Sequence, residues 1–401
     1  MRRTFWVWLH RWVGLAMTIF LVIVGLSGSL LAFYSELDSL FNPSVYAISA
    51  GKPLEPGELA ARAEAATGLL VTSVATYKPG VAAWLRVEAP QGQPEPKFEY
   101  LRFDPVSGVE ISRENWGAIS DGIQNLMPFI YTLHYELALG TFGLWVLGIV
   151  ALVWTFDCFV GFYLTLPAKR LRKHVTGHVN QKYWWKRWQP AWLIRWDASA
   201  YKLNFDLHRA GGLWLWAMLL VFAWSSVYMN LSDTVYTWAT RLVAPYHTTA
   251  DLPERAMPLT QILTWREAQS VATKLMQDSA NTHGFKVVTP LGLTYHVERG
   301  VYEYRVRSSL DILDAGGMTR LIFDAESGAQ RLLLLPQGQY AGNTITSWLV
   351  ALHEGNIFGM PYRVFVCVLG LAIVMLSVTG VYIWLKKRSA KRVKQKFINL
   401  S

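Results

Sequence analysis

The chain has 401 residues, of which 52% are hydrophobic and only 16% are charged, and this composition excludes a purely soluble protein. Its formal net charge is +10, but the positive residues gather in two segments, Pro167–Phe205 with nine Lys and Arg and Lys386–Ser401 with seven. Both segments lie beside apolar runs, which is typical of membrane topology signals and argues against a nucleic-acid partner.

Four long runs are nearly free of charge, and each has the roughly 20 residues that a helix needs to cross a bilayer. The first run is too long for a removable signal peptide and lacks a small-residue cleavage site. We therefore predict four transmembrane helices, over the runs Trp12–Tyr34, Phe142–Leu166, Ala210–Asn230 and Pro361–Leu385.

The two long connections between these runs are acidic. Ser35–Leu133 has seven Lys/Arg and twelve Asp/Glu, and Leu231–Leu352 has ten and eleven. Because positive residues near span ends mark the cytoplasmic side, we expect both termini and the basic loop in the cytoplasm and both connections outside it. The predicted order is a first span at 1–34, an exported domain at 35–133, a second span at 134–166, a basic cytoplasmic loop at 167–205, a third span at 206–230, a second exported domain at 231–352, a fourth span at 353–385 and a basic cytoplasmic tail at 386–401.

The two halves of the chain resemble each other. The motif LHRWVGL at Leu9–Leu15 matches LHRAGGL at Leu207–Leu213, and FDPVSG at Phe103–Gly108 matches FDAESG at Phe323–Gly328. Both halves begin on the same side of the membrane, so the pattern predicts a parallel, pseudo-symmetric duplication. Helical stretches followed by alternating strands make each exported domain a small α+β module. The predicted fold class is a mainly α membrane protein, a duplicated four-helix bundle with two exported α+β domains.

The repeat also places four histidines in two pairs. His10 and His208 precede the outward spans, whereas His134 and His353 precede the inward spans. A helix that rises from His10 to the outer end of its span is about 37 Å long, so histidines at opposite faces cannot share a ligand. The remaining arrangement pairs His10 with His208 at the inner face and His134 with His353 at the outer face.

Two imidazoles that face each other inside a helix bundle form the arrangement that binds haem b through both axial positions. We therefore expect two bis-histidine b haems per chain, with these four histidines as the iron ligands. No CxxCH motif occurs, which excludes covalent attachment. Arg11 and Arg209 directly follow the first pair and are candidates to neutralise haem propionates. Gly14 and Gly212 lie one turn after it and would let a flat ring approach the backbone.

Each of these features also has an ordinary structural interpretation. A single histidine at a membrane interface is commonly an anchor, the arginines are typical topology charges, and the glycines suit helix packing. Asp157 is the one acid deep inside a span, and it is a candidate acceptor for a ligand histidine or for Arg11 or Arg209. His174 and His178 are four residues apart but lack acidic or cysteine partners, which favours a solvated basic loop.

The motifs LHRWVGL, FDPVSG, LHYELALGTFG, LHRAGGL, FDAESG, LHEGNIFG and SVTGVYIWLKK occur in this order, and the set resembles the PepSY-associated transmembrane family. Within that family the chain resembles most closely the FoxB-type siderophore reductases of the bacterial inner membrane. The resemblance implies periplasmic PepSY-like domains, two b haems and both termini in the cytoplasm. It also implies a ferric siderophore as substrate, reduced to release Fe(II), an electron donor in the cytoplasm or membrane, and siderophore-uptake components as partners.

Two other functions stay open on the sequence alone. One is a general b-type cytochrome that passes electrons to another periplasmic redox protein, and the other is a haem-free, membrane-anchored PepSY module that regulates or binds a partner. No nicotinamide or flavin motif occurs, so another molecule must bring the electrons. Five aromatic residues of the exported domains are candidate contacts for a ferric chelate, although strand packing is the ordinary explanation for most of them: Trp84, Tyr100, Trp116, Tyr302 and Tyr304.

Overall fold

The fold comes from a computed structural model that describes residues 2–76, 78, 80–168, 181–255, 259 and 261–398. The predicted loop residues His174 and His178 lie outside the described residues. The chain separates into two compact units. A helical unit contains Met1–Ala32, Thr132–Leu231 and Arg363–Ser401, and a sheet unit contains Phe33–Tyr131 and Ser232–Tyr362.

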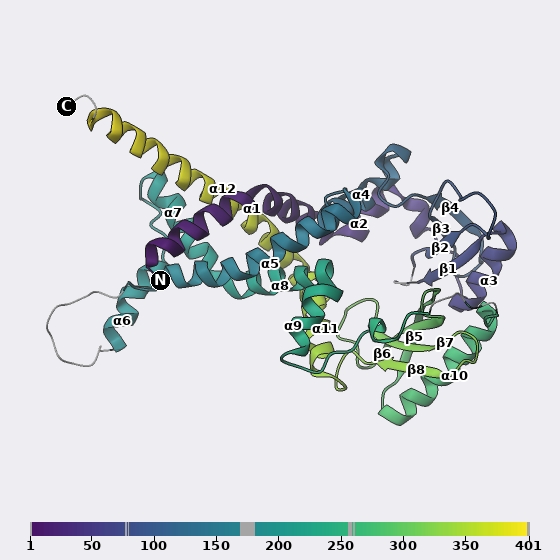
Figure 1. Ribbon diagram of the computed structural model, residues 1–401. Coiled ribbons are helices and arrows are strands. Elements are labelled where there is room, and N and C mark those ends of the chain that lie inside the picture. Colours follow the sequence, from purple (N-terminus) through teal and green to yellow (C-terminus); the bar gives the residue numbers. More distant parts are fainter. Residues whose placement is uncertain are drawn as a thin grey trace. The chain divides into compact units, whose positions relative to one another are not determined.

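Long apolar helices dominate the helical unit (Figure 1). Within the described residues, three helices are long and apolar enough to cross a membrane: Arg3–Leu31, Gly140–Thr165 and the Gly359–Ala390 part of a longer helix. The helices of this unit are α1 (Arg3–Leu31), α5 (Gly140–Thr165), α6 (Gln181–Trp188), α7 (Ala200–Trp214), α8 (Trp216–Leu231) and α12 (Gly359–Ile398). Helix α12 begins four residues before the last segment of this unit does.

The predicted third span, Ala210–Asn230, is not one straight helix. It contains the end of α7 and most of α8, and the two helical segments are bent by 69° at a break that leaves Leu215 between them. Gly211 and Gly212 lie just before the break, and adjacent glycines are poor helix formers that allow a sharp bend. The segment crosses a membrane only if the bent pair acts as one span.

Helices α1 and α12 approach each other through small residues. A Cβ atom added to Gly370 would lie 2.5 Å from the carbonyl oxygen of Gly25 and 2.3 Å from Oγ of Ser29. The Ser29 hydroxyl also lies 2.8 Å from the carbonyl oxygen of Cys367. Small residues of this kind let two helix backbones come close enough for van der Waals packing inside a membrane.

Left-handed residues precede both α5 and α12. Helix α4 (Leu126–Glu136) is followed by Leu137 and Ala138 with φ of 57° and 52°, and helix α11 (Ala341–His353) is followed by Phe358 with φ of 61°. Such values cost about 1 kcal/mol each for a non-glycine residue, so they end a helix sharply. His134 and His353 therefore belong to short helices of their own, and α5 and α12 begin several residues after them.

The sheet unit is built around one antiparallel sheet of eight strands in the order β4-β3-β2-β1-β5-β6-β7-β8 (Figure 1). The first predicted module supplies β1 to β4 and the second supplies β5 to β8. The two halves meet where β1 pairs with β5, for example Ser73 with Thr294. The strands are β1 (Leu70–Ala75), β2 (Ala83–Glu88), β3 (Tyr100–Phe103), β4 (Glu110–Glu114), β5 (Val287–His296), β6 (Val301–Ser308), β7 (Thr319–Asp324) and β8 (Gln330–Leu334).

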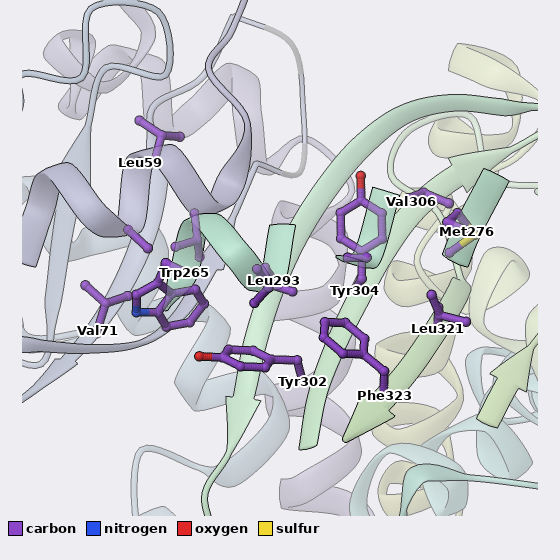
Figure 2. Packing of buried hydrophobic residues seen from close by; sticks show 14 of the residues in the cluster. Leu59, Val71, Trp265, Met276, Leu293, Tyr302, Tyr304, Val306, Leu321 and Phe323 are labelled. Atoms are coloured by element: carbon purple, nitrogen blue, oxygen red, sulfur yellow. The ribbon is translucent and has the colours of Figure 1, made fainter. Parts of the chain in front are cut away.

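One hydrophobic core serves both halves of this sheet. Residues of α3 (Pro56–Thr67) and α10 (Trp265–His283) pack with the inward side chains of the strands. Figure 2 shows Leu59 and Val71 of the first half in the same cluster as Trp265 and Leu293 of the second half. Helix α10 starts at a capping box of Thr264 and Glu267, which satisfies backbone N–H groups that would otherwise lack partners. Two short helices complete the unit, α2 (Tyr34–Phe41) and α9 (Thr237–Arg241).

The repeated FDxxSG motif forms a turn in each half. The Asp104 carboxylate accepts hydrogen bonds from the backbone N–H groups of Val106 and Ser107. Asp324 accepts from Glu326 and Ser327 in the same way. An aspartate that bonds the backbone two and three residues ahead is a common turn-forming device, so this motif has a structural role.

Candidate functional site

His10 lies on α1 and contacts the acid that the sequence singled out. Its Nδ1 atom is 2.9 Å from both Oδ1 and Oδ2 of Asp157 on α5. Asp157 is only 8% exposed. A carboxylate can only accept, so Nδ1 of His10 carries a proton, and in the neutral ring Nε2 has the lone pair. Of the three candidate partners for Asp157, the structure brings His10 to it.

His208 lies on α7 and is held by α12. Its Nδ1 atom donates to the carbonyl oxygen of Leu376 at 2.9 Å and lies 3.2 Å from Oγ1 of Thr379. Because a carbonyl oxygen has no proton to give, Nδ1 must again be the protonated nitrogen. Both histidines therefore present an Nε2 atom that is able to bind a metal.

The two rings come together in the helical unit. The ring centres of His10 and His208 are 6.1 Å apart, with the planes inclined at 57°. A first-row metal bonds an imidazole nitrogen at about 2 Å and the ring centre lies about 1 Å further, so two rings on opposite sides of one iron have centres about 6 Å apart. In the part of the chain that the structure describes, Nε2 of neither ring forms a hydrogen bond. This pair fits the axial positions of a haem.

Each of three candidate ligands rests on a glycine of a neighbouring helix. A Cβ atom added to Gly161 would lie 3.6 Å from Cε1 of His10, and one added to Gly380 would lie 3.3 Å from Cε1 of His208. A Cβ atom at Gly28 would lie 2.9 Å from Cε1 of His134. The glycines give the imidazole rings room to lie against helix backbone, which fixes where each ring can be.

His134 lies near the end of α4 and contacts α1. Its Nδ1 atom is 3.0 Å from Oγ of Ser27, and that hydroxyl donates its own proton to the carbonyl oxygen of Ile23 at 2.7 Å. Ser27 Oγ is therefore shared between the Ile23 carbonyl oxygen and the His134 ring, and the tautomer of His134 sets the direction of the second bond. Sequence reasoning missed Ser27 and Gly28, because a Ser-Gly pair in an apolar run usually indicates helix packing. The repeat aligns Ser225 with Ser27, which is a signal for Ser27, but it aligns Gly28 with Ser226 and gives no signal for Gly28.

His353 is the last residue of α11 and belongs to the sheet unit. Its pairing with His134 stays a prediction of the repeat. Among the described residues, no group of three or more His, Cys, Asp and Glu side chains could hold a metal ion. A two-residue site is the kind that axial haem ligation requires, because the porphyrin supplies the other four nitrogens.

The two arginines predicted beside the first pair differ in their surroundings. Nη2 of Arg209 donates to the carbonyl oxygen of Pro190 at 2.6 Å and to Asp206 at 2.9 Å, so this residue anchors α7. Its buried Nε atom has no hydrogen-bond partner among the described residues, which leaves one donor for an anionic group. Arg11 lines a shallow hollow together with Arg3 and Trp8. A role for either arginine toward haem propionates stays a prediction.

The five aromatic candidates divide into two groups. Tyr302 and Tyr304 are 1% and 2% exposed and point into the sheet core, so the ordinary packing explanation holds for them (Figure 2). Trp84 instead contacts Trp116, with ring centres 4.3 Å apart, and Tyr100, at 5.1 Å. All three are partly exposed, on β2, on β3 and just after β4. They stay candidates for contact with a ligand.

Comparison with known proteins identifies the family but no specific relative. The sequence pattern of the PepSY-associated TM region matches residues 7–387, a range that includes all four candidate histidines. A search of curated proteins found no match. The chain therefore belongs to the PepSY-associated transmembrane family.

Proposed function

We propose that this protein carries electrons across the bacterial inner membrane and reduces ferric siderophores in the periplasm, which releases Fe(II). The proposal assigns two b haems to the chain, one between His10 and His208 and one between His134 and His353, within a duplicated bundle whose termini are cytoplasmic. Haem b supplies a one-electron couple whose potential depends on its axial ligands and their surroundings. An unidentified donor in the cytoplasm or membrane brings the electrons.

The observation that carries the proposal is the geometry of His10 and His208. Their ring centres are 6.1 Å apart, and Asp157 and Leu376 hold the two Nδ1 atoms. Membrane-interface anchoring does not explain why the two rings lie close together, because an anchor requires only that each ring reach the interface. The haem-free alternative leaves both Nε2 atoms without an explanation.

A row of residues on the sheet unit is the candidate contact surface for a small chelate as the electron acceptor. On the sheet face opposite α3 and α10, the register aligns Arg102, Trp84, Arg305 and Arg320 in one row across the strands, and the row passes through the small residues Ala75 and Gly292 at the β1–β5 junction. The Arg102 guanidinium lies 3.4 Å above the Trp84 ring. Arg102 is paired with Glu114, and Arg305 and Arg320 are paired with Glu303, so the row offers a ligand its aromatic rings and small residues more than free positive charge. A protein partner would instead favour the general cytochrome alternative.

The first test is an optical spectrum with haem quantitation on the detergent-purified full chain. We expect two b haems per chain, and we expect His208→Ala to retain about one of the two. His283→Ala is the matched control, because His283 lies on α10 and, among the described residues, hydrogen-bonds only the local Ser279 carbonyl oxygen. A colourless protein would support the haem-free module, and a single haem in the wild type would show that one pair is wrong.

The second test separates the two redox functions. The reduced protein is mixed with ferric siderophores of several classes in a stopped-flow spectrometer, and separately with candidate periplasmic redox proteins. We expect rapid reoxidation by at least one ferric siderophore. Reoxidation by a redox protein alone would replace the reductase proposal with the general cytochrome.

A further inference from the structure

The histidines of the helical unit differ in what their Nδ1 atoms contact. His10 contacts the Asp157 carboxylate, whereas His208 contacts the backbone carbonyl oxygen of Leu376 and the Thr379 hydroxyl. Nδ1 of His134 lies beside the Ser27 hydroxyl, and this ring also bonds the Val24 backbone. Of the contacts named here, only that of His10 is to a carboxylate.

The difference arises at positions that the repeat aligns with each other. Asp157 lies four residues before Gly161, on which the His10 ring rests, and Leu376 lies four residues before Gly380, on which the His208 ring rests. At the first position the acceptor is a side-chain carboxylate, and at the second it is the main-chain oxygen of an apolar residue. A duplication that needed only to orient its ligands could use a main-chain oxygen twice, so the carboxylate calls for an explanation of its own.

We propose that Asp157 is a positioning residue that lowers the reduction potential of the haem held by His10 and His208 and so directs electrons toward the haem held by His134 and His353. This inference rests on the proposed function. A carboxylate that accepts a hydrogen bond from the Nδ1–H group makes Nε2 of His10 a stronger electron donor to iron. Its negative charge, 8% exposed among apolar helices, also favours the more positive Fe(III) state over Fe(II).

The direction of electron flow follows from this asymmetry. A one-electron transfer is downhill when the electron leaves the site of lower potential, where Fe(II) is oxidised to Fe(III), and reduces Fe(III) to Fe(II) at the site of higher potential. Neutral partners such as Ser27 do not favour Fe(III) in this way. The Asp157 carboxylate therefore favours electron transfer from the first histidine pair to the second.

The test is a spectroelectrochemical titration of the full-length protein in detergent. For the wild type we expect two transitions. Asp157→Asn keeps an oxygen acceptor but removes the charge, so we expect the lower transition to move upward while the higher one stays in place and two haems are retained. Asp197→Asn is the matched control, because it removes a carboxylate from an exposed position of the same unit, and we expect both transitions to stay where they are.

Asp157→Ser provides a second variant that copies the neutral partner of His134, and we expect the same upward shift. Two retained haems with unmoved potentials in both Asp157 variants would overturn the inference. Loss of one haem in both variants would also overturn it, because Asp157 would then hold the site together instead of setting its potential. A wild type without haem would instead overturn the proposed function itself, so the two failures are distinguishable.

Discussion

Gly14 borders open space beside His10 in the structure. It lies one helical turn after His10 on α1, and a Cβ atom placed there would meet no atom within 4 Å. Gly25 and Gly370, in contrast, are in close contact with the opposite helix. Helix packing therefore explains Gly25 and Gly370 but does not explain Gly14, and a flat ring beside Gly14 stays a prediction.

A larger side chain at this position distinguishes a haem from lipid or empty space. We expect Gly14→Leu to lower the haem content from two toward one per chain, because the leucine would occupy the volume beside the ring of His10. The thermal stability of the protein should change little, because the structure places no side chain there to clash with. Haem quantitation and a melting curve on the purified protein check both expectations.

Ala16→Leu is the control for this variant, because Ala16 is an exposed residue of the same helix. It should retain both haems. If Gly14→Leu also retained two haems with an unchanged spectrum, the predicted position of the ring beside α1 would be wrong.

The candidate site could be predicted in part at the residue scale. His10, His208 and Asp157 could be predicted because the sequence contains a repeated motif and a single acid inside an apolar run. Ser27 and Gly28 did not, because their contact with His134 depends on how α4 meets α1. The sequence also could not decide which nitrogen of each imidazole carries the proton, since that depends on the acceptor that the fold brings to Nδ1.

At the scale of elements, three of the four predicted spans form single long helices, whereas the remaining one contains a break that its apolar sequence did not reveal. The run Ala210–Asn230 has no charge to interrupt it, so the 69° bend between α7 and α8 has no hydropathy signal. Left-handed conformation at Leu137 and Ala138 is equally invisible, because neither residue type favours it. The two turns were easier to predict, because the aspartate and glycine of the repeated FDxxSG motif are typical turn residues.

The turn aspartate predicts a pH dependence of stability. Burial alone would raise the pKa of Asp104, but hydrogen bonds from Ser49, Val106 and Ser107 outweigh it and lower the pKa to about 2, from the usual 3.8. A carboxyl group whose pKa is depressed by folding stabilises the protein above pH 3.8, and that contribution is lost as the pH falls toward 2. We expect the melting temperature, followed by tryptophan fluorescence, to fall over this range.

Asp104→Asn should melt lower at neutral pH, by an amount that corresponds to about 1–3 kcal/mol for weakened acceptance at a buried turn. Its melting temperature should also depend less on pH between 4 and 2 than that of the wild type. A steeper dependence in the variant would contradict this account of the turn.

At the scale of the whole molecule, the sequence predicted two exported modules but not their common sheet. The alternating strands and the helical stretches Glu58–Thr67 and Trp265–Asp278 were visible as local patterns. The pairing of β1 with β5 was not, because strands from distant segments leave no local signal of which edge they share. A common core follows from that pairing, since Leu59 and Val71 pack in one cluster with Trp265 and Leu293.

A glycine at this junction makes the pairing testable. A Cβ atom added to Gly292 on β5 would lie 2.5 Å from the carbonyl oxygen of Val74 on β1. We expect Gly292→Val to destabilise the sheet by about 1–3 kcal/mol, because overpacking forces the strands apart. Hydrogen exchange should become faster in β1 and β5 before it does so in β3 or β7.

Val288→Thr changes an exposed residue of the same strand and should leave the exchange rates unchanged. Equal exchange in the Gly292→Val variant and the wild type would mean that the two halves do not pair through β1 and β5.

The shared sheet has a consequence for how the protein is made. Ser73 and Thr294, hydroxyl partners at the junction, are 221 residues apart in the chain. At about 5–20 residues per second, the ribosome needs roughly 10–40 seconds to synthesise the stretch between them. During that interval the unpaired β1 edge is an open template for aggregation. The segment Ser35–Leu133 has twelve acidic and seven basic residues, so the incomplete sheet has a net negative charge. Electrostatic repulsion between nascent copies then opposes their association until β5 has been synthesised.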